Sequence, residues 1–179
     1  MSYCEVTFTT SFTSTAGEDT AAKVAEIISS LSTDIFTLAS EETGEEQKQS
    51  IISKYPTYTH HDLDVAVCSG SAESAVDEKA PEDLTEALTN IVSISGNRIS
   101  FRAQNNEIDG QDTNLFWAVL TNLLPLMEES YAKVSMNYDD SREGITTILE
   151  VLYKDGSVKS LDEVLAAAWR PIGALIQLS

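Results

Sequence analysis

The sequence predicts an α+β fold in which one largely antiparallel or mixed sheet is covered by helices on one face. Three observations support this prediction. Apolar and polar residues alternate with a period of two in several segments, which is typical of strands with one wetter face. Segments with helical periodicity lie between them, and a hairpin pattern follows near the end of the chain. A doubly wound parallel sheet would need more strands that are apolar throughout.

Size and composition fit one domain over residues 1–179. Of the 179 residues 42% are hydrophobic, which is sufficient material for a core. No linker rich in Pro or Ser and no fixed-period repeat divides the chain. The first residues lack the pattern of a signal peptide, and no apolar stretch approaches 18 residues. We therefore expect a cytoplasmic protein without membrane contact.

The chain is expected to begin with a strand followed by a helix. Residues 4–9 alternate apolar and polar side chains, which predicts the strand. Residues 15–18 have the spacing of a capping box, and apolar residues then recur at helical spacing, which predicts a helix over 17–31. Residues 34–40 fit either a short strand or a helical turn, and periodicity does not decide between them.

The next part of the chain is predicted to be helix, strand, loop and helix. A short helix around Ile51 and Ile52 is expected to end before Pro56. Alternating β-branched residues predict a strand over 63–68, and the small and acidic residues 69–80 are typical of a surface loop. Pro81 is well placed as the first residue of a helix with Leu84, Ala87, Leu88 and Ile91 on its buried side.

The middle of the chain predicts a strand, a central helix and a hairpin. Strict alternation predicts a strand over 98–104, and the polar residues 105–114 indicate a loop. Residues 115–120 open a helix that is apolar almost all round and that Pro125 bends or ends, so it belongs at the centre of the structure. Residues 132–138 and 145–153 should pair as an antiparallel hairpin.

The C-terminal part combines a tight turn with a helix. Asp155-Gly156 predicts a turn that brings residues 157–159 onto the preceding strand. Residues 160–163 have the pattern of another capping box, and a helix should follow and stop near Arg170 because of Pro171. The apolar tail 174–178 is expected to pack back on the body.

Charge restricts the class of partner more than any motif does. The chain has 29 acidic and 11 basic residues, a net charge of −18. Direct binding to nucleic acid or to an anionic membrane is not expected, because each phosphate contact requires Lys or Arg. Residues 1–97 hold 17 acidic and 4 basic residues, whereas residues 98–179 hold 12 and 7, so the N-terminal half dominates the electrostatic field.

Two acidic clusters and two tyrosines form the candidate partner-binding surface. The first cluster consists of Glu41, Glu42, Glu45 and Glu46. The second consists of Asp77, Glu78, Glu82, Asp83 and Glu86. Between the clusters lie Tyr55 and Tyr58, which are candidate anchors together with the neighbouring histidines.

Candidates for chemistry are few, because the common phosphate-loop, dinucleotide, serine-hydrolase and zinc motifs are absent from the sequence. Imidazoles meet carboxylates at one place, where they could ligate zinc or manganese or form a solvated loop entering a strand: His60, His61, Asp62 and Asp64. On the predicted strand both carboxylates would project from the same side. No cofactor is predicted.

The cysteines and two short polar segments have a structural interpretation. Residues 68–71 could form a nucleophile turn or an anion-binding nest, but a structural turn is the preferred interpretation. Cys4 and Cys68 are expected to be reduced and mostly buried. The acids of residues 139–143 lack the ligand order of a calcium loop and indicate a hairpin turn.

Three classes of function remain open. The leading hypothesis is an acidic, non-enzymatic binding protein that neutralises a basic protein, for example an immunity or inhibitor protein for a toxin such as a nuclease. In size and charge the chain resembles bacterial immunity proteins. The alternatives are a small-ligand or metal-dependent enzyme domain using residues 60–64, and a structural or assembly subunit that associates through exposed aromatics and the tail from Ile172. We expect a monomer or a homodimer.

Overall fold

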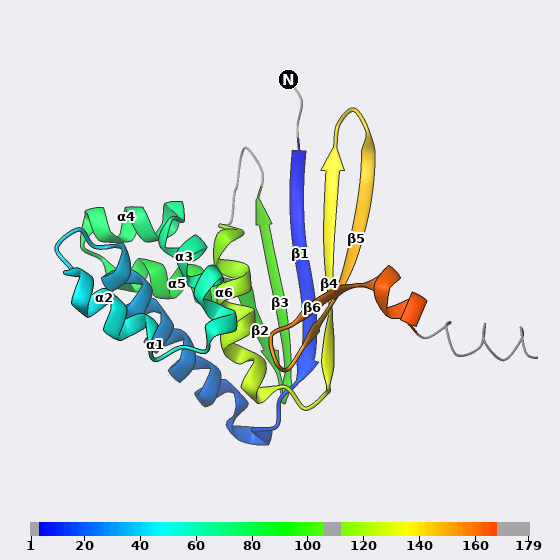
Figure 1. The fold of residues 1–179 in the computed structure, drawn as a ribbon, viewed down its shortest axis with the longest axis horizontal. Coiled ribbons are helices and arrows are strands. Elements are labelled where there is room, and N and C mark those ends of the chain that lie inside the picture. The colour runs from blue at the N-terminus through cyan, green and yellow to red at the C-terminus, as the bar shows by residue number, and fades with distance from the viewer. Residues whose placement is uncertain (1–3, 106–111, 168–179) are drawn as a thin grey trace, which may run out of the picture.

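A computed structural model, which describes residues 4–105 and 112–167, has an α+β architecture with a six-stranded sheet and a layer of helices on one face of it (Figure 1). The strand order is β2-β3-β1-β4-β5-β6, and every neighbouring pair is antiparallel. The predicted fold class is therefore confirmed, and the sheet is antiparallel rather than mixed.

The elements have the following bounds. The strands are β1 Cys4–Thr13, β2 Val92–Ser95, β3 Arg98–Asn105, β4 Tyr131–Asp140, β5 Gly144–Tyr153 and β6 Val158–Ser160. The α-helices are α1 Thr20–Ala39, α2 Glu45–Ile52, α3 His60–Val67, α4 Gly70–Glu78, α5 Pro81–Ile91 and α6 Asn114–Leu123. Short 3-10 turns are η1 Gly17–Asp19, η2 Thr57–Thr59 and η3 Leu124–Leu126, and residues 161–167 are also helical.

The first strand organises the sheet because it pairs on both sides, with β3 and with β4. Its alternation turns Phe8 and Phe12 toward the helices, and the Phe12 ring packs against Phe101 of β3 with centroids 5.3 Å apart. Thr10 shares that inner face, and its hydroxyl donates to the Lys133 carbonyl oxygen at 2.6 Å. The buried polar group is thus satisfied.

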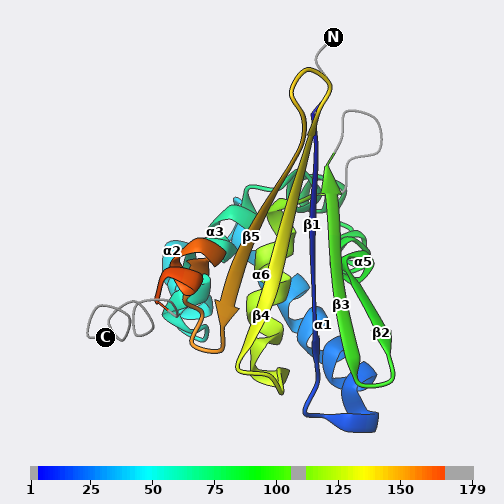
Figure 2. The same cartoon turned by 90° about the vertical axis from the view of Figure 1, so that its right-hand side faces the viewer.

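Helix α6 lies between the sheet and the other helices (Figure 1), and it stands behind the sheet in the view onto the outer face of the sheet (Figure 2). Its side chains are buried on nearly all sides, as its all-round apolar sequence predicts. Helix α1 contributes the longest buried stripe, which consists of Val24, Ile28, Leu31, Ile35 and Leu38. That stripe continues through residues 34–39, so this segment belongs to α1 and forms no strand.

Two predictions between residues 63 and 80 are wrong. The predicted strand 63–68 lies in helix α3, because Leu63 and Ala66, three positions apart, both point into the core. The predicted loop 69–80 contains helix α4, whose small residues Ala72 and Ala75 allow close packing against its neighbours. Burial at helical spacing prevails here over β propensity and loop-like composition.

Smaller differences concern helix starts and one missed strand. Residues 15–18 form no capping box, because the Thr15 amide donates to the Leu126 carbonyl and η1 precedes α1. The second capping box does form, with Ser160 N bonded to Glu163 Oε2 at 3.0 Å and Glu163 N bonded to Ser160 Oγ at 3.3 Å. Strand β2 was not predicted and pairs with β3 across the Gly96-Asn97 turn.

The remaining predicted elements are confirmed where the structure describes them. Helix α5 begins at Pro81, and both hairpins, β4–β5 and β5–β6, have the predicted pairing. The helix stop near Arg170 and the tail 174–178 lie outside the described residues. Cys4 and Cys68 are free thiols as expected, but both are exposed, so their predicted burial is wrong.

The turn between β5 and β6 requires glycine for two reasons. Gly156 has φ +81°, and a Cβ there would lie 2.7 Å from Tyr58 Cβ and closer still to its ring. Gly144 has a similar φ of +85° with nothing within 4 Å of a Cβ.

We predict that Gly144→Ala lowers the free energy of unfolding by about 1 kcal/mol and Gly156→Ala by a further ~1–3 kcal/mol. Urea denaturation of both variants tests this, and equal losses would contradict the contact with Tyr58.

Candidate functional site

The helical layer carries most of the negative charge. Residues 17–91, from η1 to α5, contain 16 acidic and 4 basic residues. All nine carboxylates of the two predicted clusters are exposed, since the buried faces of α2, α4 and α5 turn them outward. In the helical layer the one ion pair among the described residues joins Lys23 and Glu26 at 3.4 Å. The surface is therefore acidic and largely unneutralised.

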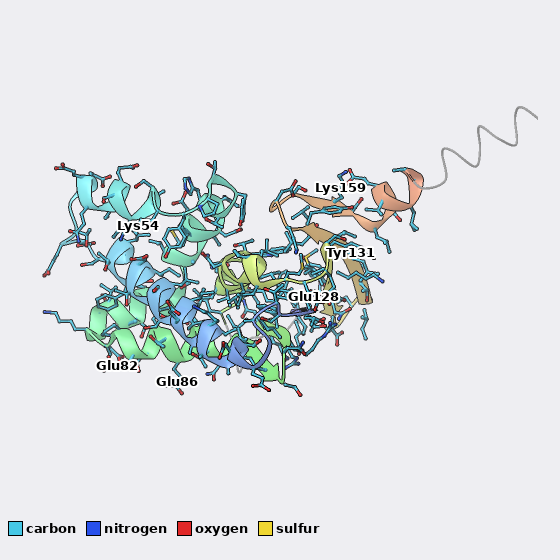
Figure 3. The ribbon with its side chains drawn as sticks, turned by 90° about the horizontal axis from the view of Figure 1, so that it is seen from below. Lys54, Glu82, Glu86, Glu128, Tyr131 and Lys159 are labelled. Carbon is cyan, nitrogen blue, oxygen red and sulfur yellow. The ribbon has the colours of Figure 1, made fainter. Side chains whose placement is uncertain are left out.

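The two clusters form separate patches. One occupies the α1–α2 connection and the first turn of α2, and the other the end of α4 and the start of α5, at the end of the layer remote from the sheet (Figure 1). Seen from below, α2 and α5 lie on opposite sides of α1, with Glu82 and Glu86 pointing away from the body (Figure 3). Acids in the first turns of α2 and α5 are stabilised by the helix dipole.

The predicted anchor Tyr55 has a structural role. Its half-buried hydroxyl donates to Asp34 Oδ2 at 2.6 Å, which ties the chain before η2 to α1. Burial, together with the hydrogen bond and the negative charge of Asp34, raises the pKa of the Tyr55 phenol far above its usual range. Tyr58 instead packs against the turn at Gly156 and remains half-buried at the surface.

The predicted metal candidates separate around helix α3. His60 Nε2 lies 3.0 Å from the Tyr55 carbonyl oxygen, and Asp64 is exposed. Because α3 is a helix, Asp62 and Asp64 do not share a side, so that part of the prediction is wrong. Within residues 4–105 and 112–167 no three His, Cys, Asp or Glu side chains are placed to hold a metal ion.

Three of the predicted residues do converge, on a groove between α3, α6 and the strands. Tyr58, His61 and Asp62 line a cavity of about 540 Å³ whose other described walls come from β1, α6, β4, β5 and β6. Those walls are Phe8, Trp117, Thr121, Met136, Glu150, Gly156 and Val158. Glu150 could have been noticed in the sequence as the acid at an inward position of the β4–β5 hairpin. We call this cavity the aromatic groove.

Asp62 is a partly buried carboxylate of the aromatic groove. Its Oδ2 accepts a hydrogen bond from Thr121 Oγ1 at 3.3 Å. Partial burial raises the pKa of the Asp62 carboxyl, while the Thr121 hydroxyl and the nearby His61 oppose the rise. The Thr121 hydroxyl and His61 therefore do not fully offset the cost of burying the ionised Asp62 carboxylate.

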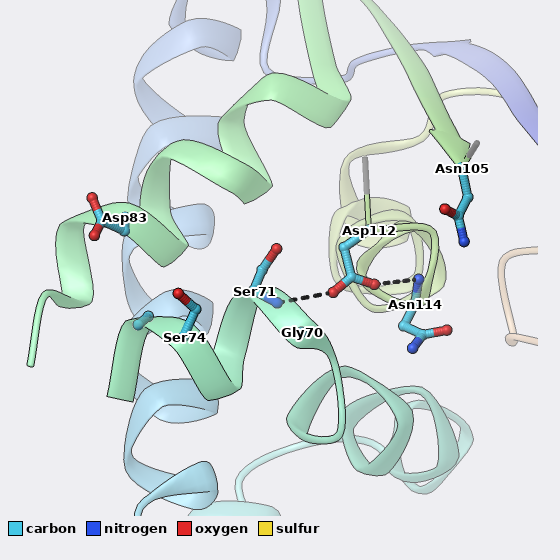
Figure 4. A pocket seen from close by; sticks show the side chains of 8 residues that line it. Gly70, Ser71, Ser74, Asp83, Asn105, Asp112 and Asn114 are labelled. Carbon is cyan, nitrogen blue, oxygen red and sulfur yellow. Dashed lines mark hydrogen bonds between the residues drawn. The ribbon is translucent and has the colours of Figure 1, made fainter. Parts of the chain in front are cut away.

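Residues 68–71, for which a structural turn is the preferred interpretation, include the residue that caps helix α4. Ser69 Oγ accepts from Ala72 N at 3.0 Å and caps helix α4. Beside it lies an open polar cavity of about 630 Å³, where Asp112 accepts from Ser71 N at 3.2 Å and from Asn114 N at 3.0 Å (Figure 4). The start of α4 thus already has an anion of its own chain, the Asp112 carboxylate.

Three basic side chains lie together on the opposite face of the sheet. Arg98, Arg102 and Lys133 line a hollow of about 940 Å³ on that face. Arg98 donates to Glu129 Oε1 at 3.0 Å and to Ser11 Oγ at 2.8 Å. Burial acts to raise the pKa of Glu129, but hydrogen bonds from its own backbone and from Thr13, together with the charge of Arg98, lower this pKa. This face of the sheet thus carries charges of both signs, in contrast to the acidic helical layer.

Comparison with family models, with curated proteins and with solved structures finds no match to this chain. Among the described residues, no helix has the length and apolar character needed to cross a membrane. The function must therefore be inferred from the surface and the cavities themselves.

Tyr55 and Tyr58 form a matched pair for testing the structural role of the Asp34 contact. We predict that Tyr55→Phe lowers the free energy of unfolding by about 1 kcal/mol, whereas Tyr58→Phe changes it little, because the Tyr58 hydroxyl has no hydrogen-bond partner among the described residues. The raised pKa of Tyr55 means that its contribution is complete below the unfolded value of 10.0 and is lost as pH rises above it. Denaturation between pH 7 and pH 11 measures both effects, and equal losses in the two variants would contradict this assignment.

Proposed function

We propose that this chain is a binding protein whose acidic helical layer docks onto a basic protein partner. The observation that carries the proposal is the unneutralised charge of residues 17–91, held on helices whose buried faces fix the direction of the carboxylates. Such a field accelerates the approach of a cationic partner, and carboxylates at contact distance accept charge-assisted hydrogen bonds from Lys and Arg.

The finer role we propose is that of an inhibitor, specifically a bacterial immunity protein that covers a basic toxin such as a nuclease in the cytoplasm. An acidic surface that occupies the groove of a nucleic-acid-binding protein competes with the phosphate backbone for the same cations. The separation of the two clusters on either side of α1 gives two contact regions, which suits a partner with two basic patches.

An enzymatic role receives less support from the described residues. Ser69 is used as a helix cap, and the His60–Asp64 side chains are divided between a backbone contact, solvent and the aromatic groove. The role of an assembly subunit stays a prediction, as does the choice between monomer and homodimer. Such a role would use exposed aromatics and the tail from Ile172: Tyr131 is exposed on β4, and the tail lies outside the described residues. Further exposed apolar side chains on β5 are Ile145, Ile148 and Leu149.

Charge-neutralised variants test the proposed function. The test variant combines Glu82→Gln, Asp83→Asn and Glu86→Gln, and the matched control combines Asp139→Asn, Glu143→Gln and Asp162→Asn, which are exposed acids outside the helical layer. We predict that the test variant raises the dissociation constant for the partner about tenfold. Three exposed contacts at roughly 0.5 kcal/mol each add up to a loss of binding free energy that corresponds to about one factor of ten in affinity. The control should bind like the original chain.

The partner is first captured from host lysate and washed at low and moderate salt, and its binding is then measured with purified proteins by calorimetry. A single basic protein that survives moderate salt and distinguishes the two variants supports the proposal. Capture of many basic proteins that are all released together by salt, with equal behaviour of both variants, would overturn it, because long-range attraction alone is screened within about 8 Å at physiological ionic strength.

A further inference from the structure

The aromatic groove combines two features that recognise the same class of ligand. The groove has a volume of about 540 Å³ and is open to solvent. Its rim includes Val158, which is 44% exposed, and the exposed His61. Its walls contribute three aromatic rings and two carboxylates from different elements. None of the described lining residues is Lys or Arg. The groove therefore presents two carboxylates and a π surface, with the imidazole of His61 but no Lys or Arg among its described walls.

The aromatic walls are held in place from behind. The buried Phe116 ring contacts Phe8 at a centroid distance of 5.2 Å and meets Trp117 edge-on at 5.6 Å and 89°. Tyr58 is braced by the β5–β6 turn at Gly156. All three groove aromatics, Phe8, Tyr58 and Trp117, are half-buried, so a part of each side chain remains accessible. A rigid π surface attracts a cation without loss of side-chain entropy on binding.

Neither carboxylate forms an ion pair with Lys or Arg among the described residues, and His61 is the nearby side chain that can carry positive charge. Asp62 accepts one hydrogen bond, from Thr121, and no ion pair reaches Glu150 in the described part of the chain. Glu150 lies on β5 opposite Val134, in the register that faces the helices rather than the outer face of the sheet. Partly desolvated carboxylates of this kind gain most from a cation that brings several N–H donors.

We propose that the aromatic groove binds the guanidinium group of an arginine side chain presented by the basic partner. A guanidinium is planar and weakly hydrated, so it stacks on aromatic faces while its N–H groups donate to the carboxylates that line the same cavity, Asp62 and Glu150. A lysine ammonium is more strongly hydrated and cannot stack in this way. The proposal rests on the proposed function only for the source of the arginine; the chemistry of the groove stands independently of it.

Fluorescence of Trp117 gives a direct test with a small probe. The chain contains two tryptophans, so the full-length chain with Trp169→Phe leaves Trp117 as the reporter. The probe is acetyl-arginine methylamide, and its neutral counterpart is acetyl-citrulline methylamide, which replaces the guanidinium by a urea group. We expect a saturable change with the arginine probe and at least about tenfold weaker binding of the citrulline probe, as for loss of one charge-assisted contact. Equal binding of the two probes would overturn the proposal.

Two isosteric variants locate the binding site. Glu150→Gln and Asp62→Asn each retain the shape of the side chain, and we expect each to weaken the arginine probe about tenfold. Glu128→Gln is the matched control, because Glu128 is an exposed acid that does not line the groove and should leave binding unchanged. Probe binding that is indifferent to Glu150→Gln and Asp62→Asn would overturn the assignment.

The same variants separate this proposal from the proposed function. If Glu150→Gln leaves binding of the captured partner unchanged while neutralisation of Glu82, Asp83 and Glu86 weakens it, the acidic layer is the docking surface and the arginine proposal fails. If no basic protein is captured but the arginine probe binds and depends on Glu150, the groove chemistry holds and the proposed function fails. Partner binding that depends on Glu150 and on the α5 cluster supports both.

Discussion

Burial of α6 between the sheet and the remaining helices is the constraint on which the rest of the structure depends. Seven residues of this ten-residue helix are buried, and each large apolar side chain removed from water contributes about 1.5–3 kcal/mol. Phe116 contacts β1 through Phe8, and the Thr121 hydroxyl reaches Asp62 of α3. A helix that is apolar on almost all sides can be stable only if other elements surround it, so its position determines where α1, α3 and α5 pack and where the aromatic groove opens.

The elements that could be predicted from the sequence are those whose signal is local. Strand β3 alternates strictly, α5 begins with Pro81 at its first turn, and the Asp155-Gly156 turn determines the pairing of β6. Helices α3 and α4 were not predictable in this way. Each is short, and Val65 and Val67 favour a strand unless Leu63 and Ala66 are both required by the core. That requirement arises from α6, which lies about fifty residues further along the chain.

The candidate sites also differ in whether their signal is local in the sequence. Exposure of the acidic clusters follows from the polarity of their side chains and from the helical stripe opposite them, both of which are visible in the sequence. The aromatic groove was not visible, because Phe8, Trp117 and Glu150 come from three distant elements and each has an ordinary structural interpretation alone. Tyr55 shows the reverse case, since a residue that resembles a surface anchor in the sequence is engaged with Asp34 in the fold.

Strand β5 is only partly paired on its outer edge, and the acidity of the chain affects whether two copies can associate there. Strand β6 covers β5 only over Glu150–Leu152, so in the described part of the sheet residues 144–149 offer one unpaired edge with apolar side chains, of which Ile145 is 73% exposed. An open edge of this composition is a template for strand addition and hence for aggregation. The nearby hairpin end carries Asp139, Asp140 and Glu143, and two copies with a net charge of −18 repel each other. Electrostatic repulsion between copies therefore opposes aggregation through the unpaired edge of β5.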